Sequence, residues 1–378
     1  MVNPEQNQVR IMEGKEEPRS LALLFFLRLL SRLYLYTVRF RNFLYETNLL
    51  AIRKLPCKVI SIGNLCVGGT GKTPMTIYIS ELLRKQGFKV CVITRGYRGK
   101  AERKGGIAGD GQAIFMSPDI AGDEPFMMAR TLTNIPVLVG RNRFQSGMTA
   151  IHQFGAEVIV LDDAFQHRKL FRDVDIVLLD GKAPLGIGKP LPMGRLREPV
   201  EALSRSHAVV FTRSEPNDSG KGDDPSIPIR NILKKQPIFH SMHLPHIHAM
   251  IQAGEMKAGL PEVQTALALE SLEGKSVIAF SGLAENHHFK NTLLEHGLDV
   301  VGFYDFKDHH VYSKEDLQTL IGTASRSRVE YLVTTEKDFV KLPDDMAWPV
   351  ALVVVGVKIS MGSEEKDFEL FLMSQLSR

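Results

Sequence analysis

The residues in this sequence with the clearest chemical meaning form a glycine-rich loop that also carries a lysine and two threonines. Its sequence is Cys66-Val67-Gly68-Gly69-Thr70-Gly71-Lys72-Thr73. Such a loop can point successive backbone N–H groups at one anion, and the N-terminus of a following helix adds partial positive charge. In this motif the lysine reaches the β- and γ-phosphates, and the threonine hydroxyl ligates Mg²⁺. The alternative is a structural glycine turn, because Cys66 stands where the strict motif has glycine.

The segments on either side of the loop favour phosphate binding. The apolar run 58–63 before it predicts a buried strand, and residues 76–86 after it predict a helix that Gly87 ends. Pro74 lies close to the first helical turn, where its missing N–H costs little. A strand, a loop and a helix in this order are the context that the motif requires. We therefore predict that the loop binds a nucleoside triphosphate.

Two adjacent aspartates give the second chemical signal. Asp162 and Asp163 follow the apolar residues of a predicted strand that starts at Glu157. Two neighbouring carboxylates at a strand end are costly unless a cation or hydrogen-bond donors compensate them. We predict that they hold Mg²⁺ together with Thr73, as acidic residues after a buried strand do in such proteins. The alternative is a capping role; Asp180, after a similar apolar run, is expected to be structural.

Other polar residues follow predicted strands or open a predicted helix. Asp123 stands at the N-terminus of a predicted helix at 121–130, where it could simply be the N-cap. Tyr97 lies in the basic stretch 95–98 after a predicted strand at 88–94. Arg143 follows the predicted strand 136–140, and this arginine either holds phosphate or is solvated. Open α/β sheets bind ligands at the C-terminal ends of their strands.

Length and composition describe a folded α/β protein. The chain has 378 residues, enough for two domains, with 44% hydrophobic and 24% charged residues. Its three cysteines have no C-x-x-C spacing, so neither a disulfide framework nor a zinc site is expected, and a reducing cytoplasmic compartment is favoured. A net charge of +4 is too small to indicate a nucleic-acid partner. No protein partner is inferred.

We expect a mostly parallel P-loop NTPase-type sheet with a second, smaller α/β domain. The expected segments are an N-terminal tail and amphipathic helix at 1–52, the P-loop core at 53–225, a β-rich linker at 226–273 and the smaller domain at 274–378. The composition of 215–225 is that of a loop at the domain edge. Strands are expected at 238–250, where four histidines are predicted to be exposed rather than metal ligands: His240, His243, His246 and His248.

The N-terminal region predicts a helix at a membrane surface. Residues 1–17 are polar and acidic and carry no cleavage site, so no signal peptide is expected. The apolar run 21–40 is interrupted by Arg28 and Arg32, whereas a spanning helix needs about 18–20 residues with few charges. Arg28, Arg32 and Arg39 would form one basic stripe on a helix. We predict interfacial membrane contact through residues 20–45; packing on the protein itself and a true span are the alternatives.

Several stretches together resemble one family, the tetraacyldisaccharide 4′-kinases, which are the lipid A 4′-kinases of Gram-negative bacteria. The resemblance runs from about residue 20 to the end. It is most specific in Asp162-Asp163-Ala164-Phe165-Gln166-His167-Arg168. The other matching stretches are 63–74, 95–97, 122–125, 140–143, 172–175 and 194–199.

The resemblance implies ATP- and Mg²⁺-dependent phosphorylation of the 4′-hydroxyl of a tetraacylated glucosamine disaccharide 1-phosphate. It also implies a peripheral or monotopic position on the cytoplasmic face of the inner membrane. It assigns the catalytic base to Asp123 and its histidine partner to His309 or His310, with His309 preferred, and Lys72 would neutralise charge. Residues near the disaccharide or the closing domain would be Tyr97, Arg143, His167, Arg197 and Glu198.

The sequence departs from the family pattern at two places besides Cys66. Ala164 stands where glycine is more common, and the stretch 280–289 lacks the usual Asn-Pro after its turn. Two other functions stay open at this point. One is a P-loop GTPase or ATPase that acts as a partner-dependent switch or metallochaperone. The other is a catalytically silent, membrane-associated nucleotide-binding protein.

Overall fold

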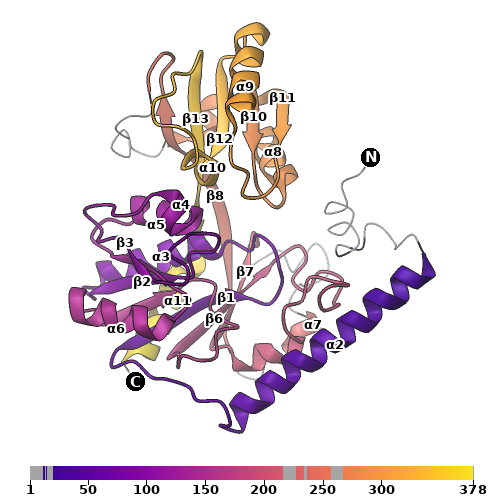
Figure 1. Cartoon of the computed structure of the whole chain (residues 1–378), viewed down its shortest axis with the longest axis vertical. Coiled ribbons are helices and arrows are strands. Elements are labelled where there is room, and N and C mark those ends of the chain that lie inside the picture. The colour runs from indigo at the N-terminus through magenta and orange to yellow at the C-terminus, as the bar shows by residue number, and fades with distance from the viewer. Residues whose placement is uncertain are drawn as a thin grey trace.

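The computed structural model describes residues 20–215, 227–233, 236–256 and 267–377, together with Met12 and Gly14. Most of the expected polar tail at 1–17 and of the expected loop at 215–225 therefore lies outside the described residues. Figure 1 shows a larger lower part and a smaller upper part, with helix α2 (Leu21–Glu46) along the lower edge. The other helices of the lower part are α3 (Lys72–Lys85), α4 (Pro118–Ala121), α5 (Asp123–Thr131), α6 (Arg143–Phe154), α7 (Ile227–Arg230) and α11 (Glu365–Leu376). Those of the upper part are α8 (Asn286–Glu295), α9 (Lys314–Ser327) and α10 (Glu336–Phe339).

The sheet is mostly parallel, as the sequence predicted, but it runs through both parts as one sheet, which was not predicted. Its strand order is β11-β10-β12-β13-β8-β7-β6-β1-β5-β2-β4-β3, with β9 paired to β8. The lower strands are β1 (Lys58–Asn64), β2 (Val90–Thr94), β3 (Gly106–Gly109), β4 (Val137–Val139), β5 (Val158–Leu161), β6 (Val174–Asp180) and β7 (Ala208–Thr212). The remaining strands are β8 (Ile238–Ile251), β9 (Leu267–Ala268), β10 (Ser276–Ser281), β11 (Asp299–Asp305), β12 (Tyr331–Thr335) and β13 (Ala351–Ser360).

The long strand β8 belongs to both parts. Its first residues pair in parallel with β7, and its later residues pair with β13 in antiparallel register. Figure 1 shows β8 rising from the lower part into the upper part. The two parts therefore share main-chain hydrogen bonds and are not joined by a linker alone.

Helices cover both faces of the lower sheet. Successive apolar residues of its strands point to opposite faces, so each face has its own hydrophobic core. Ile60 and Ile62 of β1 face one core with Met75 of α3, while Val59 faces another with Ala150 of α6. Strands buried on both faces and covered by helices are typical of parallel sheets. The predicted strand before the glycine-rich loop and the helix after it are both confirmed. The helix starts at Lys72, earlier than the predicted 76, directly after the loop.

The C-terminal helix α11 returns to the lower part. Phe368 and Leu372 are fully buried in the same core as Ile60 and Met75. We keep the four expected segments as a proposal for the organisation of the chain. The segment 274–378 thus includes a helix that packs outside the smaller α/β part.

The β structure predicted at 238–250 is confirmed, as the single strand β8, but the prediction that its histidines are exposed is wrong. All four are at least half-covered, because β8 is paired along both edges and neighbouring segments cover its faces. His248 lies with its Nδ1 2.7 Å from an oxygen of Glu336, and His240 lies 3.3 Å from Glu364. Burial, helped by Arg213, lowers the pKa of His243 to about 4.

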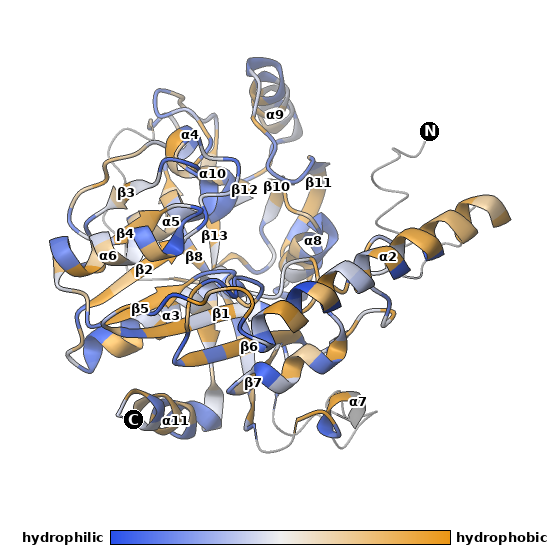
Figure 2. Cartoon of the chain, turned by 60° about the horizontal axis from the view of Figure 1, so that its bottom comes forward, coloured by the Kyte–Doolittle hydropathy of each residue, from blue (hydrophilic) through white to orange (hydrophobic). Residues whose placement is uncertain are grey.

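Helix α2 is long, apolar and largely exposed. Among the described residues, it is the helix whose length and hydropathy would suffice to cross a membrane. Figure 2 shows a mostly hydrophobic helix whose N-terminal half extends beyond the rest of the protein. Phe25 and Tyr36 are 69% and 78% exposed, and Arg28 is also exposed. The basic and apolar faces expected from the sequence are both open to solvent.

Candidate active site

The glycine-rich loop has a conformation that depends on its glycines. Gly68 and Gly71 have φ angles of +128° and +79°, which side-chain-bearing residues rarely adopt. A Cβ atom on Gly68 would overlap the guanidinium of Arg195, and one on Gly71 would overlap the ring of His243. Inside the loop, the Asn64 amide donates to the Thr70 hydroxyl over 3.0 Å. The loop is thus held between β1 and the N-terminus of α3, the arrangement that suits anion binding.

The two aspartates after β5 sit beside this loop in opposite electrostatic environments. Asp162 is buried and accepts a hydrogen bond from Thr76 (3.1 Å), and the Thr94 hydroxyl lies 3.4 Å away. Burial, with the nearby Glu124 and Asp163 carboxylates, raises the pKa of Asp162 to about 7.

Asp163 is compensated by two cations. Burial alone would raise the pKa of its carboxyl, but the charges of Lys72 and Arg197 lower it. One Arg197 nitrogen contacts both Asp163 oxygens, at 2.8 and 3.0 Å, and Lys72 Nζ lies 3.9 Å away. The loop lysine and the aspartate pair are therefore neighbours, as the sequence predicted.

Asp123 opens α5, and a histidine from the upper part contacts it. His309 Nδ1 lies 2.9 Å from Asp123 Oδ2, whereas His310 pairs with Asp316. Burial alone would raise the pKa of Asp123, but the hydrogen bond from His309 and the charges of Lys341 and Lys337 lower it. The carboxyl is ionised at neutral pH. The Tyr97 ring meets the His309 ring edge-on, with ring centres 5.9 Å apart.

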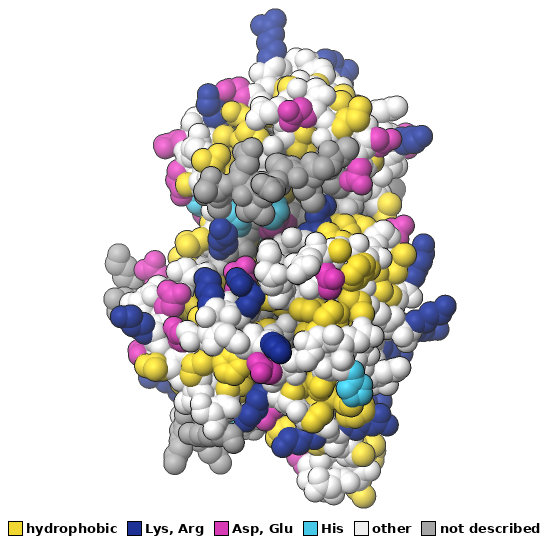
Figure 3. Space-filling view, turned by 90° about the vertical axis from the view of Figure 1, so that its left-hand side faces the viewer, with side chains coloured by type: hydrophobic (Ala, Val, Ile, Leu, Met, Phe, Trp, Pro, Cys, Tyr) yellow, Lys and Arg dark blue, Asp and Glu magenta, His cyan; other side chains and the backbone are white. Residues whose placement is uncertain are grey.

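Lys337 is a charged neighbour of this contact that the sequence reasoning did not assign. Its Nζ lies 3.1 Å from Asp308, 3.5 Å from His309 Nε2 and 3.6 Å from Glu124. The available signal was its place just after the strand 331–335, at the C-terminal edge of the sheet. Figure 3 shows charged side chains gathered where the upper and lower parts meet.

Two more predicted residues lie close to the aspartate pair. Arg143 is buried and donates to the Gly140 carbonyl over 2.6 Å; burial lowers its pKa to about 10. Burial and the charges of Arg143 and Arg172 lower the pKa of His167 to about 4, so His167 is neutral at physiological pH. Arg143 therefore braces the strand end from within and is not a solvated surface cation.

Glu198 faces helix α2 and not an open surface. It is 1% exposed and accepts a hydrogen bond from Asn42 (2.8 Å) and another from Arg205 (3.0 Å). Arg41 of α2 lies 3.4 Å from its other oxygen. The expectation that Glu198 lies near the disaccharide finds no support in this packing, because side chains cover it completely.

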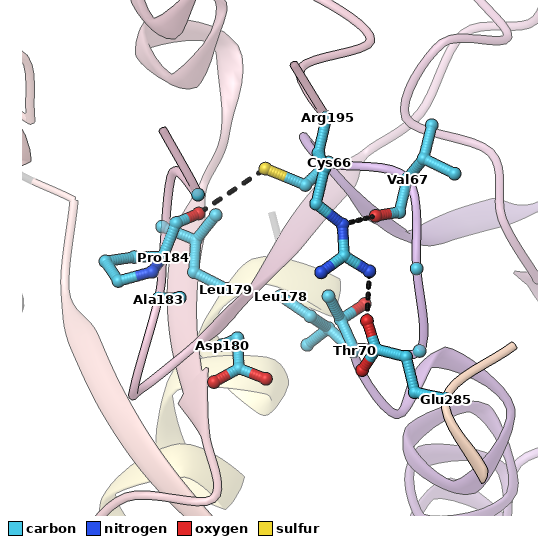
Figure 4. Close-up of a pocket in the computed structure, with 13 residues that line it drawn as sticks. Cys66, Val67, Thr70, Leu178, Leu179, Asp180, Ala183, Pro184, Arg195 and Glu285 are labelled. Atoms are coloured by element: carbon cyan, nitrogen blue, oxygen red, sulfur yellow. Dashed lines mark hydrogen bonds and ion pairs between the residues drawn. The ribbon is translucent and has the colours of Figure 1, made fainter. Parts of the chain in front are cut away.

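A pocket lies on the outer side of the glycine-rich loop. Figure 4 shows it between the loop, the end of β6 and the segment that carries Pro184 and Arg195. Asp180, at the end of β6, lines it, and Glu285 of the upper part reaches it from the opposite side. The pocket therefore brings together residues from the lower and upper parts.

Comparison with known proteins decides the family. A sequence model of the family described as tetraacyldisaccharide-1-P 4′-kinase matches residues 23–377. The chain belongs to this family. It is therefore a kinase of lipid A biosynthesis, and the resemblance seen in the sequence is confirmed.

Curated relatives and a solved structure agree with this assignment. Two proteins named tetraacyldisaccharide 4′-kinase, from Syntrophus aciditrophicus and Desulfatibacillum aliphaticivorans, are each 38% identical to the chain. Each alignment covers 93% of this chain and 92% of the relative. The structure of LpxK from Aquifex aeolicus in complex with ATP superposes with a TM-score of 0.72 at 31% identity, and covers 94% of this chain and 99% of that one.

In this kinase, the part of α2 from Ser31 to Asn42 is fastened to the segment 190–198. Ser31 donates to the Pro190 carbonyl and Tyr34 to the Arg197 carbonyl, each over 2.8 Å. With the contacts of Asn42 and Arg41 to Glu198, four polar contacts hold the helix beside a segment that also carries Arg197. The helix is thus part of the folded kinase and not a separate tether.

We predict that Glu198→Ala destabilises the kinase by about 3–5 kcal/mol, because it leaves Arg41 and Arg205 without their buried counter-charge. Denaturant unfolding of the purified protein measures the change. The control is Glu201→Ala, whose exposed carboxylate lies 4.0 Å from Arg39 and whose loss should cost about 0–1 kcal/mol. Equal stability of the two variants would contradict a buried anchor at Glu198.

Proposed function

We propose that this kinase transfers the γ-phosphoryl group of ATP to the 4′-hydroxyl of a tetraacylated glucosamine disaccharide 1-phosphate. The observation that carries the proposal is the contact of His309 with Asp123, at 2.9 Å, near a loop that suits phosphate binding. A sugar hydroxyl must lose its proton as the phosphoryl group moves, and an ionised carboxylate can accept it.

Asp123 is the proposed general base and His309 its positioning partner. The carboxyl of Asp123 is ionised at neutral pH because its pKa is lowered, so one oxygen can accept the hydroxyl proton. His309 Nδ1 donates to Oδ2, which fixes the orientation of the carboxylate. On the far side of the imidazole, Lys337 adds positive charge. The Tyr97 ring, half exposed and packed on His309, is proposed to border the disaccharide together with His167.

The loop 66–73 is proposed to hold the triphosphate of ATP. Its backbone N–H groups and the N-terminus of α3 would surround the phosphates, and Lys72 would neutralise developing charge on the transferred group. Arg197 lies on Asp163, and Arg143 braces the neighbouring strand end, so both are proposed to shape the site from behind.

Mg²⁺ is proposed to bind between Thr73, Asp162 and Asp163. The residues fit this ion, because a buried carboxylate whose pKa is raised to about 7 would be stabilised by an adjacent cation. Among the described residues, no group of three His, Cys, Asp or Glu side chains could hold a metal ion. Mg²⁺ is commonly held by one or two carboxylates together with substrate phosphates. The ion would neutralise phosphate charge.

Helix α2 is proposed to lie in the membrane interface on the cytoplasmic face of the inner membrane. Its exposed residues include apolar side chains such as Leu21 and Phe25 and the basic Arg28, Arg32 and Arg39. An exposed apolar face with flanking arginines binds the boundary of anionic lipid headgroups and acyl chains. The acylated substrate would reach the kinase from the same membrane.

The direct test is incubation with labelled ATP, Mg²⁺ and a tetraacylated disaccharide 1-phosphate, scored for phosphate at the 4′ position. We expect Asp123→Asn to lower kcat by about 10²–10⁴-fold, the contribution of a general base. Its affinity for a non-hydrolysable ATP analogue should stay unchanged. Lys72→Ala should lower both kcat and the affinity for the ATP analogue. Full activity of Asp123→Asn would remove this residue as the base.

The contact with His309 also predicts a pH effect. Removing the imidazole in His309→Ala deletes a hydrogen bond that lowers the pKa of Asp123, so that pKa rises. Since the base works only when ionised, the acidic limb of the kcat/KM profile should move to higher pH. His310→Ala is the matched control, because His310 pairs with Asp316. An unmoved limb in His309→Ala would contradict the proposed contact.

For the membrane, we predict that the triple variant Leu21→Ser, Phe25→Ser, Leu29→Ser loses vesicle affinity by about tenfold or more, since each buried apolar side chain contributes about 1.5–3 kcal/mol. Sedimentation with phosphatidylglycerol vesicles measures the affinity. The control replaces three exposed apolar residues of the upper part by serine: Leu244, Leu294 and Val301. Equal pelleting of the two variants would show that α2 does not make the membrane contact.

A further inference from the structure

Arg195, in the segment after β6, makes two hydrogen bonds to the backbone of Val67 in the glycine-rich loop. The Val67 N–H donates to the Arg195 carbonyl over 2.7 Å. The Arg195 Nε donates in turn to the Val67 carbonyl over 2.9 Å, as Figure 4 shows. The neighbouring backbone is also paired, because the Arg197 N–H donates to the Leu65 carbonyl over 2.8 Å. The outer edge of the loop is therefore fixed by residues 195–197.

This contact determines which way the next peptide group points. In a planar trans peptide, the carbonyl of one residue and the N–H of the next point in opposite directions. The hydrogen bond from Arg195 holds the Val67 carbonyl toward the outer side of the loop. The Gly68 N–H of the same peptide therefore points to the opposite side of the loop. The guanidinium packs so closely on Gly68 that a Cβ there would overlap it. The loop shape thus depends on Arg195 and Gly68 together.

The same guanidinium also contacts a carboxylate from the upper part. Arg195 Nη2 donates to Glu285, the residue just before α8. Both side chains are mostly covered, with 23% and 13% exposed for Arg195 and Glu285. Burial alone would raise the pKa of Glu285, but the hydrogen bond and charge of Arg195 lower it. The ion pair therefore joins the upper part directly to the loop.

A second arginine makes a similar connection. Arg213, after β7, donates to the Gly69 carbonyl and to Asp180, the latter over 2.8 Å. Its Nη1 lies 3.2 Å from His288 Nδ1, and His288 lies 3.4 Å from Glu285. Two carbonyl groups of the loop are thus held by arginines that both touch the N-terminal turn of α8.

We infer that Arg195 is a positioning residue for nucleotide binding, which fixes the Val67–Gly68 peptide of the loop, and that Glu285 holds its guanidinium in place. The inference rests on the proposed binding of ATP to this loop. It makes the N-terminus of α8 a determinant of nucleotide affinity, although α8 belongs to the other part of the kinase.

The test compares Arg195→Gln, Arg195→Lys and Glu285→Gln in the full-length kinase. We expect Arg195→Gln to raise the KM for ATP, and the Kd of a non-hydrolysable ATP analogue with Mg²⁺, by about tenfold, the effect of losing a charge-assisted hydrogen bond. The KM for the lipid acceptor should stay unchanged. Arg195→Lys should be equally impaired, because an ammonium cannot replace the guanidinium fork that contacts both Val67 and Glu285.

Glu285→Gln should raise the Kd by about threefold, as expected for a partly covered ion pair. The double variant Arg195→Gln/Glu285→Gln should bind no more weakly than Arg195→Gln, because the two residues act through one contact. Lys182→Gln, which removes an exposed charge from the same segment, is the control and should bind normally. Melting temperatures of all variants check that they are folded.

Three outcomes would overturn the inference. Normal affinity in Arg195→Gln would show that the contact of Arg195 with the loop does not affect nucleotide binding. Normal affinity in Arg195→Lys would show that only positive charge is needed. An equal rise in the KM values for ATP and acceptor would point to a general structural role. A wild-type kinase that fails to bind the analogue would overturn the proposed function itself, whereas normal wild-type binding with unaffected variants would overturn only the role of Arg195.

Discussion

The double pairing of β8 is the constraint on which the active site depends. Its residues Ile238–Ser241 run parallel to β7 of the lower part, and the residues from Met242 to Ile251 run antiparallel to β13 of the upper part. This shared strand fixes how far the C-terminal strand ends of the two parts lie from each other. A slip of two residues between β8 and β13 would shift the upper part by about 6–7 Å. The Asp123–His309 hydrogen bond, at 2.9 Å, would not survive such a shift. A long shared strand therefore does what a flexible linker could not, since it holds the two residues within contact distance, and the ion pair of Lys337 with Glu124 adds to this.

The three acidic residues of the site differ in ionisation because they differ in their neighbours. Asp163 and Asp123 have cations or a histidine in contact, and their pKa values are lowered despite burial. Asp162 is surrounded by hydroxyl groups and other acids, and its pKa is raised to about 7. A raised carboxyl pKa means that the folded state prefers the protonated form. This group therefore costs stability as the pH rises from its unfolded pKa near 4 through about 7. A cation bound beside Asp162 would remove that cost, which supports the proposed Mg²⁺ site.

Local patterns predicted the lower sheet and its loop well. The apolar run before Asn64, the glycines, and the aspartates after β5 are signals that lie within a few residues of each other. What the sequence could not supply depends on contacts between distant segments. The pairing of β8 with β13, the return of α11 to the core around Ile60 and the covering of the β8 histidines depend on pairing and packing between segments that are distant in the sequence. The burial of Glu198 is of the same kind, because its partners come from α2, far away in the chain. The contact of His309 with Asp123 was reached only through the family resemblance.

The segment 195–198 connects features that the sequence presents as separate. Arg195 and Arg197, two residues apart in the chain, reach Val67 and Asp163 respectively. The next residue, Glu198, turns away and is buried against α2. One short segment thus contacts the glycine-rich loop, the aspartate pair and the N-terminal helix. Since α2 is the part proposed to lie in the membrane interface, the segment would hold the glycine-rich loop at a fixed position relative to the lipid surface. A kinase whose acceptor is held in a membrane needs such a rigid connection, because the phosphoryl donor must reach a hydroxyl group whose height above the bilayer is set by the acyl chains.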